Sequence, residues 1–593
     1  MRCFCVFAFL VFFSFPTLSS QKTNHIEPYW EMLFKNRRQE ALTEFQKKRK
    51  DDISGELIQE ILKAENGTFS NPDGFIEKIN SYPNFEYYLY ALWNQNFFFD
   101  TYLKTGFNKK NSKNINGIAL NRVKNTTIKE SLRYLKSVVA QHNADWETYF
   151  HLNSEIPSIK SWQFCGSFEN LNGSGLATEY GPEKNSFSEM DFNANSNGLV
   201  NWYTLEGREN EAYQYYSNHS EYGSAVNYAQ TFIDNPQDRT AVIRLGSSAL
   251  AKIWLNDVLV FENGNDGITD MDAYNVAVKL PKGHNRLLVK NADKSGIAYF
   301  IVRITDKAGQ PFNDLKFRNT YTPYNESTLE SLSPEAVSHP VESFFLNRVK
   351  KDPNNFFDSF CLFNAYLRNS KYTEAKTMLL PLLKRYPNSS FLRKYLIEIY
   401  NQEKDYASAK ELQKNIEQDD TEYFLSYLYR FQDTKALFKL PIPEFEQFVQ
   451  EFSASTDLEI IKASADLLLH IRKEDKTALK QSLKSIITEH NDQLEIVKIY
   501  LNLYISYLNE EDKAIKILED INQDYFDYSA LKSLARLYDK QNKKDRTLEL
   551  FEDQYARVSY DNIFLSDYIA YLHKNKKYTE SLPYIDQLLS NFP

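Results

Sequence analysis

One short stretch of the sequence gathers oxygen-bearing side chains at a spacing that could bind a cation. Five of them fall between positions 263 and 272, and carboxylate and amide oxygens are the ligands that Ca²⁺ prefers. The glycine and closing glutamate of an EF-hand loop are not at the required positions, so a solvated hairpin loop is the favoured interpretation. The candidate ligands for Ca²⁺, the one cofactor that the sequence suggests, are Asn263, Asn265, Asp266, Asp270 and Asp272.

A second group of residues could bind a carbohydrate. Sugar sites use aromatic rings that stack on the sugar, with amide or carboxylate groups that bind its hydroxyls. The same rings could equally pack inside a β-domain, and this is the favoured interpretation. The candidate rings, which make a glycan an alternative ligand, are Trp202, Tyr203, Tyr213, Tyr215 and Tyr216.

The sequence lacks the common catalytic motifs. It contains no Gly-x-Ser-x-Gly, no His-Glu-x-x-His and no glycine loop that would hold a phosphate. Acidic residues are too numerous for one catalytic pair to be selected, and His284, at an expected turn, is more typical of a structural histidine than of a general base. We therefore expect a protein that is not an enzyme.

The first twenty residues have the pattern of an export signal. Arg2 precedes the apolar run Phe4–Phe15, and Leu18–Ser20 resembles a cleavage site. The apolar run is shorter than the roughly 20 residues that a membrane-spanning helix needs. The sequence predicts export to the periplasm or the cell exterior, without a membrane span after the signal is removed.

The overall charge argues against a nucleic-acid partner. Lysine and arginine total 70 against 79 aspartates and glutamates, a net charge of −9, and no long basic run interrupts this balance. Binding to nucleic acid requires a basic face. The sequence thus predicts no nucleic-acid partner.

Hydrophobic periodicity divides the rest of the chain into helical and β-rich parts. Residues such as Tyr29, Trp30 and Leu33 recur at helical spacing in the first part, whereas short β-rich runs bounded by turn residues follow from about position 158. The fold class is predicted as multidomain α plus β, with an α-solenoid and helical repeats flanking an all-β sandwich. The expected divisions are a signal peptide at 1–20, helical repeats at 24–157, the β-sandwich at 158–320, a linker at 321–345 and the α-solenoid at 346–593.

The β-rich part shows the alternation of strands with one buried face. Within the run Ala251–Phe261, the pair Asn256–Asp257 predicts a hairpin turn. The segments Arg244–Gly246, Lys252–Asp257 and Leu280–Lys290 resemble the galactose-binding-like jelly-roll sandwiches of many exported proteins. That resemblance implies a spacer or a ligand-binding module.

The final part of the chain carries a 34-residue period. Tyr366 and Ala375 recur 34 residues later as Tyr400 and Ala409. This register resembles the tetratricopeptide repeat, in which an aromatic residue packs the first helix and a small residue lies where two helices cross. The tryptophan and glycine that are typical of that family are missing here. The 34-residue pattern is hard to follow between residues 419 and 492. The residues that we assign to repeat packing are Tyr366, Ala375, Pro387, Tyr400, Ala409, Ala514 and Tyr538.

The order of these parts resembles the N-terminal half of large exported bacterial proteins that end in a transglutaminase-like domain. This chain contains no such domain. The leading hypothesis is an exported, noncatalytic scaffold that binds a protein or peptide through its repeat grooves. The alternatives are a carbohydrate-binding protein that works through the sandwich, and the N-terminal portion of a transglutaminase-like enzyme.

Overall fold

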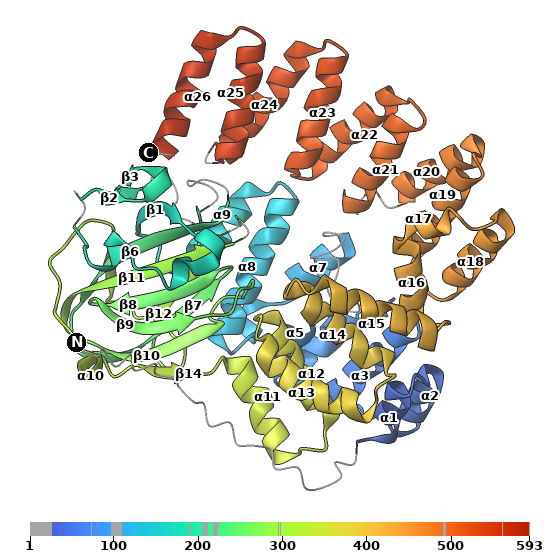
Figure 1. Cartoon of the computed structure of the whole chain (residues 1–593), viewed down its shortest axis with the longest axis horizontal. Helices are drawn as coiled ribbons and strands as arrows, with labels where there is room; N and C mark the ends of the chain where they lie inside the picture. The colour runs from blue at the N-terminus through green and yellow to red at the C-terminus, as the bar shows by residue number, and fades with distance from the viewer. Residues whose placement is uncertain are drawn as a thin grey trace, which may run out of the picture.

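The computed structural model contains two helical regions separated in sequence by antiparallel sheets (Figure 1). The mixed order of helices, strands and helices expected from the sequence is therefore confirmed. The expected signal at 1–20 lies outside the described residues, and no described helix is both long and apolar enough to cross a membrane. The structure describes residues 26–70, 72, 74–95, 109–187, 190–205, 211–216, 223–294, 296, 298–489, 491, 494–559 and 561–591.

The N-terminal helices form because apolar residues repeat at helical spacing behind polar caps. The Asp52 carboxylate accepts from Gly55 N–H, and the Asn125 side-chain oxygen accepts from Ile128 N–H, which satisfies backbone donors at two helix starts. The helices are α1 (Pro28–Phe34), α2 (Arg38–Lys48), α3 (Ile53–Glu65), α4 (Phe75–Ser81), α5 (Phe85–Leu92), α7 (Lys109–Gly117), α8 (Thr126–His142) and α9 (Trp146–Glu155).

Two large antiparallel sheets and one two-stranded sheet, β2-β3, follow, and the two large sheets share one apolar core. The larger has the order β4-β1-β6-β11-β8-β9 with β13 also paired to β6, and the smaller has the order β14-β10-β7-β12-β5. Ile233 and Val289 of the larger sheet pack in the same cluster as Ile243 and Val302 of the smaller, so the region resembles a β-sandwich. The strands are β1 (Gln163–Glu169), β2 (Phe192–Asn193), β3 (Leu199–Val200), β4 (Tyr203–Thr204), β5 (Gln214–Tyr215), β6 (Ala225–Asn235), β7 (Arg239–Ser247), β8 (Leu250–Leu255), β9 (Val258–Asn263), β10 (Tyr274–Leu280), β11 (Gly283–Asp293), β12 (Tyr299–Thr305), β13 (Lys316–Arg318) and β14 (Glu335–Val337).

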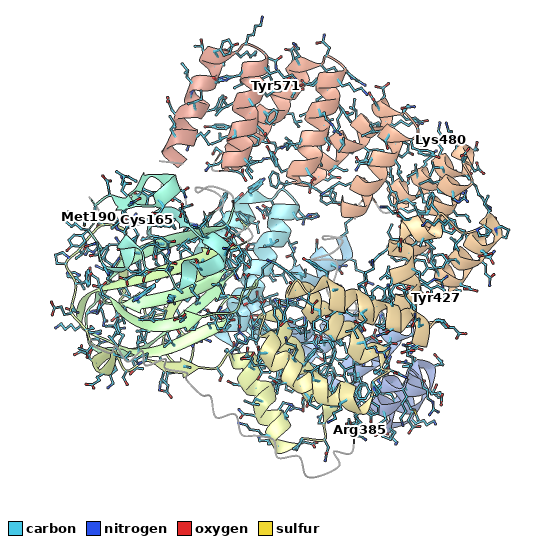
Figure 2. The ribbon with its side chains drawn as sticks, viewed as in Figure 1. Cys165, Met190, Arg385, Tyr427, Lys480 and Tyr571 are labelled. Carbon is cyan, nitrogen blue, oxygen red and sulfur yellow. The ribbon has the colours of Figure 1, made fainter. Side chains whose placement is uncertain are left out.

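The hairpin expected at Asn256–Asp257 is confirmed. Both residues have positive φ angles, 49° and 64°, and they join the antiparallel pair β8 and β9. Two successive left-handed residues match the right-handed twist of the strands, and Asn and Asp tolerate this conformation well. Cys165 in β1 is a free, buried thiol, and burial raises its pKa (Figure 2).

The C-terminal region is an array of paired helices. It begins after the short α10 (Leu329–Leu332). Its members are α11 (Pro340–Lys351), α12 (Phe356–Arg368), α13 (Tyr372–Arg385), α14 (Ser390–Gln402), α15 (Tyr406–Asp419), α16 (Phe424–Gln432), α17 (Thr434–Leu437), α18 (Ile442–Ala454), α19 (Glu459–Arg472), α20 (Lys476–Glu489), α21 (Leu494–Ser506), α22 (Glu511–Asp524), α23 (Tyr528–Lys540), α24 (Lys544–Val558), α25 (Asn562–Lys574) and α26 (Tyr578–Asn591).

A left-handed residue marks the turn inside most helix pairs of the array. Ser370 lies between α12 and α13, and Lys404 lies 34 residues later between α14 and α15. The residue after each turn donates its N–H to the carbonyl of Tyr366 or Tyr400, at 2.9 and 2.8 Å, as in a Schellman motif. The same left-handed turn recurs at Glu474, Asn509, Asn542 and Lys576.

The first N-terminal helices pack on the beginning of the array. The buried side chains of α1–α5 and α8 belong to the same cluster as those of α11–α14. Trp30 lies against Phe356 and Phe391, and the Asn36 amide in the α1–α2 turn donates to the Asn388 carbonyl at 2.8 Å. The two helical regions, far apart in sequence, therefore share one core.

A second contact joins α8 and α9 to the end of the array. Trp146 packs in one apolar cluster with residues of α23, α24 and α25, and its ring meets that of Phe526 with 4.8 Å between centroids. Phe526 N–H also donates to the His142 carbonyl at 3.0 Å. With both ends of the array held, the chain closes into a ring with the sheets on one side (Figure 1).

Candidate functional site

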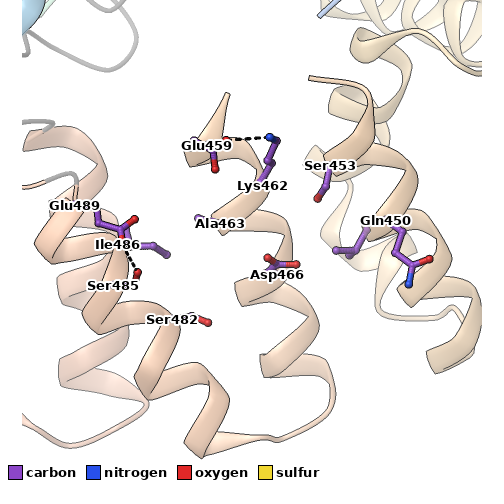
Figure 3. Close-up of a pocket in the computed structure, with 11 residues that line it drawn as sticks. Gln450, Ser453, Glu459, Lys462, Ala463, Asp466, Ser482, Ser485, Ile486 and Glu489 are labelled. Carbon is purple, nitrogen blue, oxygen red and sulfur yellow. Dashed lines mark hydrogen bonds and ion pairs between the residues drawn. The ribbon is translucent and has the colours of Figure 1, made fainter. Parts of the chain in front are cut away.

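Three successive helices of the array form a groove of about 410 Å³ (Figure 3). It lies between the two regions of the array that the N-terminal helices contact. Val449, Ala463 and Ile486, one from each helix, supply its apolar surface. The remaining lining residues are polar: Gln450 and Ser453 from α18, Glu459, Lys462 and Asp466 from α19, and Ser482, Ser485 and Glu489 from α20.

Some charged side chains of the groove have partners within the chain, and one does not. Lys462 Nζ lies 2.9 Å from Glu459 Oε1, and the Ser485 hydroxyl donates to Glu489 at 2.7 Å. Asp466 has no hydrogen bond or ion pair within the described part of the chain. Burial raises the pKa of its carboxyl, and the nearby His470 opposes this effect. Its charge is thus available to a ligand.

A buried hydroxyl also faces this groove. Ser453 projects from α18 toward the groove in Figure 3, and its hydroxyl is buried without a hydrogen-bond partner among the described residues. Leaving a buried polar group unsatisfied costs about 1–3 kcal/mol. A bound carbonyl group could accept this hydrogen bond and remove that cost once the side chain rotates to expose its hydroxyl.

The N-terminal chain fixes the loop between α18 and α19. Asp457 N–H donates to the Gly67 carbonyl at 2.9 Å, and Phe69 N–H donates to the Asp457 carboxylate at 2.8 Å. Gly67 has φ +80°, and a Cβ there would lie 1.9 Å from the Ser455 carbonyl oxygen. Glycine is required by both conformation and space. One end of the groove is therefore anchored by a segment almost 400 residues away in sequence.

The structure does not bring all five candidate sugar-binding rings together, although the ring centroids of Tyr213 and Tyr215 are 6.3 Å apart. Tyr216 lies in the core between the sheets, whereas Trp202 packs with Phe192 on the other side of the larger sheet. The Tyr215 hydroxyl is 2.8 Å from that of Tyr134 in α8. The remaining two rings also have aromatic neighbours: Tyr203 packs near Phe164, and Tyr213 packs near Tyr134. Carbohydrate binding at these rings stays a prediction.

The candidate calcium ligands have partners within the chain. Asp266 lies 3.7 Å from Lys294, while Asp270 pairs with Arg368 of α12. The Asn263 side-chain oxygen accepts from Asn265 N–H at 3.0 Å. A search of the described residues finds no group of three or more His, Cys, Asp or Glu side chains that could hold a metal. Calcium binding in this loop stays a prediction.

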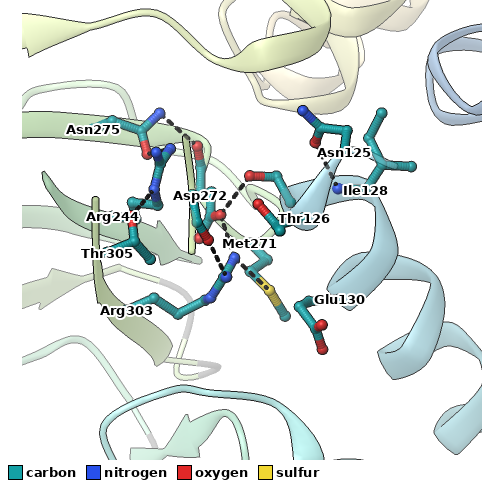
Figure 4. Close-up of polar contacts among 12 residues, drawn as sticks. Asn125, Thr126, Ile128, Glu130, Arg244, Met271, Asp272, Asn275, Arg303 and Thr305 are labelled. Carbon is teal, nitrogen blue, oxygen red and sulfur yellow. Dashed lines mark hydrogen bonds and ion pairs between the residues drawn. The ribbon is translucent and has the colours of Figure 1, made fainter. Parts of the chain in front are cut away.

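The fifth candidate, Asp272, belongs to a buried network between α8 and the smaller sheet (Figure 4). Its carboxylate accepts from Arg303 Nη1 at 2.6 Å and from the Thr127 hydroxyl at 2.7 Å. The side chains of Arg303 and Asp272 are 0% and 1% exposed. Nearby, Arg244 Nε donates to the Thr305 hydroxyl at 2.7 Å. This geometry joins the helix to the sheet and has the character of a structural contact.

The residues assigned to repeat packing lie on the paired helices. Ala375, Ala409 and Ala514 are buried on the second helices of their pairs, and Tyr538 is buried on α23. Tyr366 and Tyr400 are half-buried on α12 and α14. The exposed Pro387, in the loop before α14, accepts a hydrogen bond at its carbonyl from Arg393 Nε at 2.9 Å.

Sequence reasoning did not find the groove. Its polar residues have the spacing of an ordinary solvated helix face, and its helices fall in the stretch where the repeat frame is hard to follow. The sequence alone would allow Lys462 to pair with Asp466, whereas the structure shows that Lys462 binds Glu459. Asp466 is therefore recognised as unpaired only in the structure. No family model matches the chain, and no curated protein matches it in sequence.

Proposed function

We propose that this chain is an exported, noncatalytic binding protein that holds a protein or peptide partner in the groove formed by α18, α19 and α20. The observation that carries the proposal is the groove itself, with apolar side chains beside an unpaired carboxylate and an unsatisfied hydroxyl. Such a mixture of apolar surface with a few polar groups is typical of binding sites. The export signal expected from the sequence supports an extracytoplasmic location.

The paired helices support the same proposal. Their 34-residue spacing resembles the tetratricopeptide repeat, and stacked helix pairs of this kind form extended binding surfaces. Much of the array is already occupied, because α1–α5 contact its beginning and α8–α9 contact its end. The groove lies between these contacts, where a partner meets less competition from the chain's own helices.

Site-specific photo-crosslinking tests this function. A photoreactive residue replaces Gln450 in the groove of the full chain, and in a matched variant it replaces the exposed Glu580 on α26. We expect a discrete crosslinked protein from position 450 in cells that express the chain. The substitution Ala463→Trp, which fills the groove, should abolish it. Equal products from both positions, or none from position 450, would contradict the proposal.

A further inference from the structure

We infer that the occupant of the groove is an extended peptide segment that places a lysine or arginine side chain against Asp466. This inference rests on the proposed function and specifies its ligand chemistry. Three of the four charged residues that line the groove are acidic. A basic peptide therefore complements the groove, whereas an acidic peptide is repelled by it.

The arrangement of charges assigns the basic side chain to Asp466 rather than to its acidic neighbours. Glu459 already binds Lys462, and Glu489 accepts the hydrogen bond from Ser485. Lys462 is four residues before Asp466, one helical turn away, but its amino group is directed to Glu459 instead. The Asp466 side chain is exposed, and it makes no hydrogen bond or ion pair among the described residues, so it can meet a cation of the peptide.

The length of the groove suits a short extended segment. Its lining residues cover eight positions on α19, from 459 to 466, and eight on α20, from 482 to 489, which is about 11 Å along each helix. About three extended residues cover that length.

The Ser453 hydroxyl supplies a contact to the peptide backbone. It is buried and unsatisfied on the side of α18 that faces α19 (Figure 3). An extended peptide presents free carbonyl groups, one of which can accept from this hydroxyl once the Ser453 side chain rotates into the groove. The Ser453 contact is independent of peptide sequence, whereas the Asp466 contact selects for a basic side chain.

Fluorescence anisotropy on the full chain tests the inference with three labelled octapeptides. They share a glycine, serine and alanine background and carry two lysines, two glutamines or two glutamates. We expect the lysine peptide to bind at least about fivefold more tightly than the glutamine peptide, and the glutamate peptide to bind most weakly. Raising the salt concentration should narrow these differences, because the contact is partly exposed.

Three variants locate the effect. Asp466→Asn should reduce lysine-peptide affinity about fivefold and leave glutamine-peptide affinity unchanged, whereas Asp586→Asn, on the exposed surface of α26, should change neither. Asp466→Lys should reverse the preference toward the glutamate peptide. Circular dichroism verifies that each variant is folded.

Failure of this inference can be distinguished from failure of the proposed function. Equal affinity for all three peptides, or a lysine preference that survives in Asp466→Asn, would overturn the basic-peptide inference. Binding of none of them would also overturn it. A discrete crosslink at position 450 would still support the proposed function in each of these cases. Absence of that crosslink would instead contradict the proposed function.

Discussion

The indole ring of Trp30 stands edge-on to the ring of Phe356, with 4.8 Å between their centroids. Trp30 is in the first described helix, whereas Phe356 begins α12, and the two sheets lie between them in sequence. Trp30 is completely buried by this and neighbouring contacts. The start of the array is therefore completed by the N-terminal helices.

Replacing Trp30 with alanine should strongly destabilise this shared core. Removing a buried tryptophan leaves a cavity between α1, α12 and α14, and such changes cost about 3–5 kcal/mol. Urea unfolding measures the loss of stability. It is monitored by the far-ultraviolet circular dichroism of the helices, a signal that does not depend on the removed tryptophan. The matched variant Tyr406→Ala, at a ring that is 64% exposed, should change stability by less than about 0.5 kcal/mol. Similar midpoints for the two variants would show that the contact contributes little.

The buried pair of Arg303 and Asp272 should also be essential to stability. Asp272→Asn leaves the Arg303 charge buried without its counter-ion, which should cost about 3–5 kcal/mol. The control is Asp266→Asn, because that carboxylate is partly exposed and should lose less than about 1 kcal/mol. Thermal melting measures both variants. An unchanged melting temperature for Asp272→Asn would contradict the ion pair.

His339 should make stability depend on pH. It is fully buried where α11 begins, its Nδ1 accepts from Val341 N–H, and its Nε2 has no partner among the described residues. Burial lowers its pKa well below the usual 6.5, and the cations Lys371, Arg244 and Arg368 lower it further. The unfolded chain therefore binds a proton that the folded chain excludes, so this contribution to stability falls as the pH drops below about 6.5.

Urea midpoints at pH 7.5 and pH 5.5 test this dependence. His339→Asn keeps a helix-capping acceptor and should lose less stability on acidification than the unsubstituted chain. His151→Asn changes a largely exposed histidine and should retain the original loss. An equal loss for all three proteins would mean that His339 does not titrate as described.

The contact that joins α8 and α9 to the end of the array should control local opening. Trp146→Ala removes the ring that packs on Phe526 and on the cluster of α23–α25. We expect faster hydrogen exchange in α23–α25, with little change in the strands of the sandwich. Tyr578→Ala, at an exposed ring on α26, is the control and should leave exchange unchanged. Unchanged exchange in Trp146→Ala would show that other contacts hold this end.

The parts of the fold that depend on local pattern could be predicted from the sequence. The Asn256–Asp257 hairpin and the 34-residue spacing of the helix pairs are examples, because turn chemistry and helical period act over short distances. The 34-residue repeat pattern is lost after residue 419, because the short helix α17 lies between α16 and α18. At this junction Asp433 has a φ of −86°, so the left-handed turn of the other helix pairs is missing. The regular turn returns at Glu474.

The groove and the ring could not be predicted in the same way. Trp30 has the spacing of any core residue, and nothing in its local pattern identifies Phe356 as its partner. Asp272 is a candidate calcium ligand in the sequence because its oxygen atoms are visible there, whereas the buried Arg303 beside it is not. The sequence does not single out Asp466, because it does not show that the neighbouring Lys462 pairs with Glu459 instead. Long-range pairing decides the role of each carboxylate.

The closed ring changes how this array should respond to stress. In an open stack each helix pair contacts only its neighbours, so unravelling can start at a terminal pair and proceed inward. Here, α23–α25 are held by Trp146 and its neighbours, and α8 is itself fixed to the smaller sheet through Thr127 and Asp272. Fraying of those pairs therefore requires the loss of contacts made by a distant part of the chain. Because of the ring, the helix pairs should unfold more cooperatively than the separable units of an open stack.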